Sequence, residues 1–245
     1  MWYNLIMEIS LIIILTIVAS AIGTVTGFGT STIMIPALAL FLPPVEAIFL
    51  VSIIHWFGNV WKVTLFRSGL NWRLVGLFGL TGLLTSYLGA SVTLNVDNAV
   101  LLRGLGIFFA AYAEFLLLQS KLKVPASLGM ALLGGSLSGF FAGMFGIGGA
   151  IRSAFLTIFD LPKSVYIATA GAIGLMVDLT RVVTYIAGGI SLSPALSYGL
   201  IIFIPVSLLG AYVGKLVVNK ISQQQFRAVI AVLIFVIGIK LIIWP

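Results

Sequence analysis

The residues best suited to chemistry lie in the stretch MFGIGGAIRS, residues 144–153, where three glycines precede an arginine and a serine among apolar neighbours. Glycines let a ligand approach the backbone closely. A helix that begins after them offers unpaired N–H groups and the positive end of its dipole to an anion. An arginine adds a permanent charge and a planar fork of donors that suits an oxyanion. The residues that we predict to bind an anion here are Gly146, Gly148, Gly149, Arg152 and Ser153.

A similar break opens the stretch 28–42, FGTSTIMIPALALFL, which is also short and apolar and ends next to prolines. It carries three hydroxyl residues in a row, Thr30, Ser31 and Thr32, and we predict that they donate hydrogen bonds to the same anion. Two structural alternatives remain open. The hydroxyls would satisfy backbone groups freed by the break, and the glycines of both stretches would let helices pack closely.

Four more polar residues lie within long apolar segments. His55 and Asn59 are four residues apart and share a helix face, so we predict that both contact the anion. His55 is the only histidine, which makes it the candidate for carrying a coupling proton; the alternative is a polar packing residue. Asp178 and Arg181 are three residues apart, and they form either a self-neutralising pair or a gate that opens when the anion binds Arg181.

The position of Arg152 needs an explanation, because an arginine buried in a membrane costs at least about 2.5 kcal/mol. A bound anion would compensate its charge. The alternative is a structural ion pair with one of three acids, Asp178, Glu114 or Asp160.

The composition excludes a soluble protein. Of the 245 residues, 61% are hydrophobic and 8% are charged, and the mean hydropathy is +1.23, whereas a soluble domain carries about 25% charged residues. We therefore predict an all-α integral membrane protein with a single transmembrane domain, residues 1–245. With no cysteine and one histidine, we expect no metal site and no cofactor. Basic cytoplasmic loops account for the net charge of +7 better than nucleic-acid binding does.

The hydrophobic pattern divides the chain into long and short segments. A membrane-spanning helix needs roughly 20 apolar residues. The two stretches that begin at the breaks, 28–42 and 145–160, are shorter, and we expect short broken or re-entrant helices there. We predict full spans at 4–24, 45–66, 73–92, 99–118, 126–143, 163–187, 194–216 and 227–243.

The two halves of the chain resemble each other. GFGTSTIMIPALALFLPP in the first half is similar to MFGIGGAIRSAFLTIFDLP in the second, and Asn59 and Lys62 stand where Asp178 and Arg181 stand. Each half has an odd number of hydrophobic segments, so the two copies must lie in opposite orientations in the membrane. We place these inverted repeats at about 1–120 and about 125–245.

Charged residues support this topology. Basic residues gather on the cytoplasmic side of membrane proteins. With both termini outside an inner or plasma membrane, Glu8, Glu46 and Asp97 lie outside, and we expect Lys62 to snorkel to the inner surface. The basic residues that then lie inside are Lys62, Arg67, Arg73, Lys121, Lys123, Lys163, Lys215, Lys220 and Arg227.

The two glycine-rich breaks, each followed by a short helix and a proline-bounded turn, resemble the sulfite exporter TauE/SafE family of membrane transporters. The resemblance covers essentially the whole chain. The family's first motif reads like GxGGG followed by a proline; this chain has Thr30, Ser31 and Thr32 in place of glycines and keeps Pro36. Its second motif, GIGGAIRS, keeps the glycines and lacks the proline. The resemblance implies a secondary transporter of sulfite or of an organosulfonate such as sulfoacetate, which works by alternating access.

Three alternatives remain beside this function: an anion channel, a transporter of a non-sulfur carboxylate or oxyanion, and an enzyme. We expect no enzyme, because the chain has one histidine, no cysteine, no HExxH and no GxSxG. We also expect no ATP hydrolysis, because the chain has no Walker motif. The predicted partners are a small anion and the lipid bilayer, without nucleic acid. The small-residue face of Gly76, Gly79 and Gly82 is a candidate contact for a homodimer or for a neighbouring helix.

Overall fold

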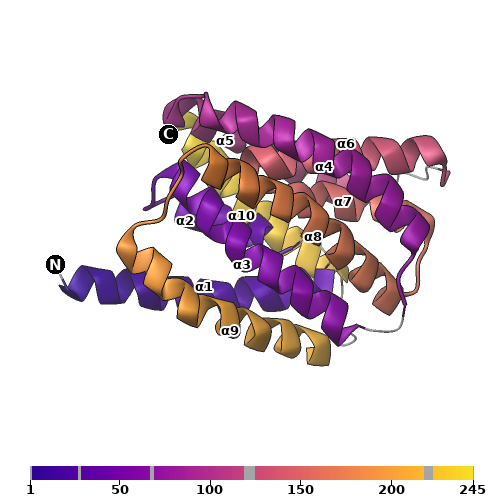
Figure 1. The fold of residues 1–245 in the computed structure, drawn as a ribbon, viewed down its shortest axis with the longest axis horizontal. Coiled ribbons are helices and arrows are strands. Elements are labelled where there is room, and N and C mark those ends of the chain that lie inside the picture. Colours follow the sequence, from indigo (N-terminus) through magenta and orange to yellow (C-terminus); the bar gives the residue numbers. More distant parts are fainter. Residues whose placement is uncertain (1, 27–28, 67–68, 119–124, 218–222, 245) are drawn as a thin grey trace.

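The computed structural model of the chain describes residues 2–26, 29–66, 69–118, 125–217 and 223–244, and these ranges contain helices and no strand (Figure 1). Seven of the helices are long and apolar enough to cross a membrane, which confirms the all-α membrane fold. The helices are α1 (Trp2–Thr26), α2 (Ser31–Leu38), α3 (Pro44–Leu65), α4 (Trp72–Leu94), α5 (Asn98–Leu118), α6 (Leu128–Phe145), α7 (Gly148–Leu156, followed by a 3-10 turn, Thr157–Phe159), α8 (Lys163–Ala187), α9 (Pro194–Val217) and α10 (Gln223–Ile243).

The helices lie where the hydrophobic pattern predicted them. The two short stretches form the broken helices α2 and α7, each of which packs back against the helix before it, α1 or α6. The last predicted span, 227–243, lies within α10, whose described apolar part is the shorter stretch Ile234–Ile243.

Both breaks depend on a glycine in the left-handed region of backbone space. Gly146 ends α6 with φ 75°, and α7 begins two residues later at Gly148. Gly29 has φ 87° and precedes α2, which begins at Ser31. A residue with a Cβ is strained at such angles, so glycine is what lets the chain turn back inside the bundle.

The helices form two groups and a pair (Figure 1). The α1 group consists of α1, α2, α3 and α9, and the α6 group consists of α4, α6, α7 and α8. Helices α3 and α8 form the main contact between the groups, and α5 packs on α10.

The pairings within the two groups, and the α3–α8 and α5–α10 contacts, map onto themselves or onto one another when each helix is exchanged for the helix five places along the chain. The smaller contacts of α2 with α10 and of α3 with α5 do not follow this pattern. Two five-segment repeats would give this pattern. In addition, α1 begins and α10 ends at the same end of the bundle (Figure 1). The inverted orientation of the repeats stays a prediction, and most of the linker that would join them, 119–124, lies outside the described residues.

Glycines bring α4 and α6 into backbone contact. A Cβ on Gly143 would lie 2.1 Å from the carbonyl oxygen of Ser86, and one on Gly139 would lie 2.2 Å from the carbonyl oxygen of Gly82. A Cβ on Gly79 would lie 2.5 Å from the sulfur of Met176 on α8. Gly79 and Gly82 therefore pack on helices of the same chain. This favours a contact with a neighbouring helix over a homodimer contact.

Adding a methyl group at this seam should destabilise the protein. Gly143→Ala forces the α4 backbone away and should cost roughly 1–3 kcal/mol, the usual cost of overpacking. Gly76→Ala on α4, with nothing within 4 Å of its Cβ, is the matched control; it should be neutral or stabilise by up to about 1 kcal/mol, because alanine favours helices over glycine. Thermal unfolding in detergent measures the stability of both variants. Equal melting temperatures for the two would contradict the close backbone contact between α4 and α6.

Charges are divided between the ends of the bundle. Asn71 at the start of α4 donates to Thr169 near the start of α8, and Lys215 near the end of α9 lies over the ring of Phe66, which follows α3, so these ends meet. The exposed residues Arg73 and Lys163 belong to the same end. Glu46 accepts a hydrogen bond from Ser193 at 2.8 Å at the opposite end, where α3 and α9 begin.

We predict that the basic end faces the cytoplasm. The chain has no cysteine, so single cysteines can be introduced without a background signal. In intact cells, a membrane-impermeant maleimide should label Ser191→Cys, before α9, and should label Ala126→Cys, before α6, only after permeabilisation; both positions are exposed. The reverse pattern would invert the predicted topology.

Candidate functional site

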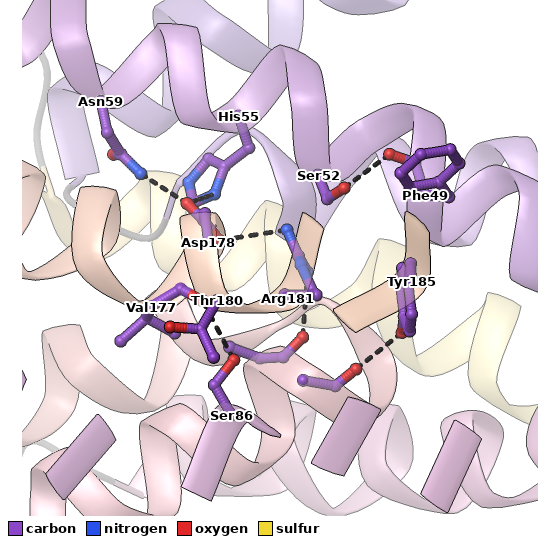
Figure 2. A network of polar contacts seen from close by, with 12 residues as sticks. Phe49, Ser52, His55, Asn59, Ser86, Val177, Asp178, Thr180, Arg181 and Tyr185 are labelled. Carbon is purple, nitrogen blue, oxygen red and sulfur yellow. Dashed lines mark hydrogen bonds and ion pairs between the residues drawn. The ribbon is translucent and has the colours of Figure 1, made fainter. Parts of the chain in front are cut away.

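The carboxylate of Asp178 is the centre of a buried polar network between α3 and α8 (Figure 2). Its Oδ2 accepts a hydrogen bond from Asn59 Nδ2 at 2.8 Å and lies 2.8 Å from His55 Nδ1. Its Oδ1 accepts from Arg181 Nη2 at 3.0 Å. The predicted pair of Asp178 and Arg181 is confirmed, and the carboxylate also joins the two helix groups through His55 and Asn59.

Arg181 reaches from α8 to the break after α6. Its Nη1 donates to the carbonyl oxygen of Ala142 at 2.9 Å, where the last turn of α6 has carbonyls to satisfy. A Cβ on Gly146 would lie 2.7 Å from the same nitrogen. Gly146 is therefore required twice, for its backbone angle and for the space that the guanidinium fills.

His55 reaches the other break. A Cβ on Gly29 would lie 2.5 Å from His55 Nε2, so the imidazole packs on the turn that leads into α2. Nε2 is buried and has no hydrogen-bond partner among the described residues. The histidine thus connects the first break with Asp178.

Two hydrogen bonds fix α8 against the α4–α6 seam (Figure 2). Ser86 on α4 donates to the carbonyl oxygen of Val177 at 3.0 Å, and Tyr185 donates to the carbonyl oxygen of Gly143 at 2.7 Å. They connect the helix that carries Asp178 and Arg181 to α4 and α6 within the α6 group.

Arg152 on α7 is buried, with 2% of its surface exposed, yet its Nε has no hydrogen-bond partner and its guanidinium has no ion pair among the described residues. Its Nη2 lies 3.1 Å from where a Cβ on Gly174 would be, and that point is 2.4 Å from Asn59 Nδ2. Glu114 and Asp160 are exposed, and the two oxygens of Asp178 bind other residues. None of the three acids forms the alternative ion pair.

Lys62 is the residue that sequence reasoning missed. It is buried, with 3% of its surface exposed, so the expectation that it snorkels to the surface is wrong. Its Nζ donates to Asn59 Oδ1 at 3.1 Å. The internal repeat could have indicated that Lys62 is buried, because Lys62 aligns with Arg181, which lies in the bundle interior.

The network leaves positive charge in excess. Lys62, Arg152 and Arg181 are buried basic residues and Asp178 is the only buried acid of the described residues, so the formal charges, three positive minus one negative with His55 neutral, leave two. Burying unpaired charge is costly, so charged residues inside a membrane are candidates for a binding site.

Of the other residues predicted to bind the anion, some contact neighbouring helices or side chains, and the rest are buried. Gly148 packs on α6, where its Cβ would lie 2.2 Å from the carbonyl oxygen of Ser138, and the hydroxyl of Ser153 contacts that of Tyr166. Thr30 donates to Ser20 at 3.5 Å. Ser31 Oγ is buried without a partner among the described residues. Gly149 and Thr32 are also buried.

Comparison with known proteins decides the family. Residues 12–241 match the sulfite exporter TauE/SafE family. The chain belongs to that family. A probable membrane transporter protein of Methanocaldococcus jannaschii is 25% identical to it, with 98% of each chain covered. Membership confirms the resemblance read from the glycine-rich breaks, and it makes the chain a multi-pass protein of a membrane transporter family.

Removing the charge of Asp178 should destabilise the fold. Asp178→Asn leaves Arg181 without its carboxylate in a dry interior, and breaking a buried pair in this way costs roughly 3–5 kcal/mol. The control Asp97→Asn makes the same change at an exposed position before α5 and should stay within about 0.5 kcal/mol of the original protein. Thermal unfolding of both variants provides the comparison, and a small loss for Asp178→Asn would contradict its central role.

Proposed function

We propose that this chain is a secondary transporter that moves a small sulfur-containing anion, sulfite or an organosulfonate such as sulfoacetate, and binds it at Arg152. The observation that carries the proposal is the buried guanidinium of Arg152, whose Nε has no acceptor and which forms no ion pair among the described residues. Membership in a transporter family supplies the class of activity.

An anion that enters the membrane loses its hydration shell, so the protein must replace those hydrogen bonds. Arg152 supplies charge-assisted donors, and the buried hydroxyl of Ser31, whose Oγ has no partner among the described residues, is a further donor. Helices α2 and α7 contact each other, and both begin at a break inside the bundle. Their N-termini add partial positive charge, as broken helices do in other transporters.

The movement in this proposal takes place between α3 and α8. These helices join the α1 group to the α6 group, whereas α4–α6 and α1–α9 are held by glycine contacts between backbones. Rocking of one group against the other would expose the site to each side of the membrane in turn. His55, Asp178 and Arg181 would then act as the gate, because the contacts of Asp178 cross this seam.

Transport into proteoliposomes tests the proposal. Arg152→Gln should reduce saturable sulfite or sulfoacetate uptake at limiting substrate more than about tenfold, because loss of one buried charged partner costs roughly 2–5 kcal/mol. Arg103→Gln, which makes the same change at an exposed position on α5, is the control and should transport normally.

The assay also separates the alternatives. Saturation with substrate indicates a carrier, whereas a flux that rises linearly with concentration indicates a channel. Uptake of carboxylates in place of sulfur anions would overturn the substrate, and normal uptake by Arg152→Gln would overturn the site.

A further inference from the structure

We propose that Lys62 is a second anion-binding residue and that Lys62 and Arg152 together select anions that carry two negative charges. This inference rests on the proposed function, since it concerns the same site. It goes further by naming the charge of the ligand and a residue that sets this specificity.

Both cations border the same amide. Asn59 Oδ1 accepts from Lys62 Nζ at 3.1 Å, and Asn59 Nδ2 lies beside the point on Gly174 that also faces Arg152 Nη2. Lys62 comes from α3 and Arg152 from α7, so the two charges approach the site from different helix groups.

No acid of the described residues forms an ion pair with either cation. The oxygens of Asp178 bind His55, Asn59 and Arg181, and the neutral amide of Asn59 separates Lys62 from that carboxylate. Two buried like charges without an ion-pair partner oppose folding, so we infer that their use lies in what they bind. A ligand with one negative charge would leave one of these cations uncompensated, whereas a ligand with two would neutralise both.

Sulfate and methanesulfonate make a matched pair of probes. Both are tetrahedral sulfur oxyanions of similar size, and they differ in one oxygen that is replaced by a methyl group, which lowers the charge from two to one. Thiosulfate is a second divalent probe. Dissociation constants are measured by isothermal titration calorimetry on the purified protein, at constant pH and ionic strength.

The original protein should bind the divalent anions at least about tenfold more tightly than methanesulfonate, a difference of about 1.4 kcal/mol. Lys62→Met should weaken divalent binding and bring this ratio close to one, while methanesulfonate binding through Arg152 persists. Lys62→Arg should keep the preference. The control Lys240→Met removes an exposed lysine from α10 and should leave the ratio unchanged.

Stability without ligand separates binding from a structural role. Lys62→Met removes a buried cation, so its unfolding temperature should equal or exceed that of the original protein. A lower unfolding temperature with equal weakening for all anions would make Lys62 structural and overturn the inference. Equal affinity of the original protein for both charge classes, or a preference that survives in Lys62→Met, would overturn it and leave the proposed function standing. Absence of binding by every sulfur anion would overturn both.

Discussion

One carboxylate, that of Asp178, holds the centre of this protein together. A membrane interior has no water to solvate a charge, so Asp178 is stable there because donors from two helices satisfy it. The same contacts join the two helix groups where they meet at α3 and α8. The interaction that compensates a buried acid is thus also the contact that any movement between the groups must change.

The surroundings of this carboxylate differ in chemistry from the rest of the bundle. Elsewhere, helices meet through glycines and apolar side chains, as where Gly143 meets the backbone of Ser86. Such seams have a single close fit and little tolerance for sliding. The α3–α8 seam contains exchangeable hydrogen bonds, and its partners include a lysine and an arginine that lack a counter-charge. Its polar character is the physical reason to expect both ligand binding and movement at this seam.

The fold was predictable because hydrophobic length and glycine-rich breaks are local signals. The run 163–187 was predicted as a span and is α8, with the same residues. The short stretch 145–160 was predicted as broken and is α7 with its 3-10 turn.

The site was predictable where spacing along one helix decides contacts, as for Asp178 and Arg181. Contacts between helices were harder. No local pattern indicates that Lys62 turns inward to Asn59, or that the hydroxyl of Ser153 meets Tyr166, because both depend on how separate helices pack.

The way the helices are grouped indicates whether each half of the chain could fold alone. Helix α4 belongs to the first half by sequence, but its glycine face is covered by α6 of the second half, and α9 in turn covers α1. Each half therefore packs one of its helices, α4 or α9, against a helix of the other half. A half expressed alone would expose those glycine faces, so half of this chain is not a folding unit. If the repeats arose by duplication, the single-copy ancestor would have been an obligate dimer whose subunits exchanged a helix.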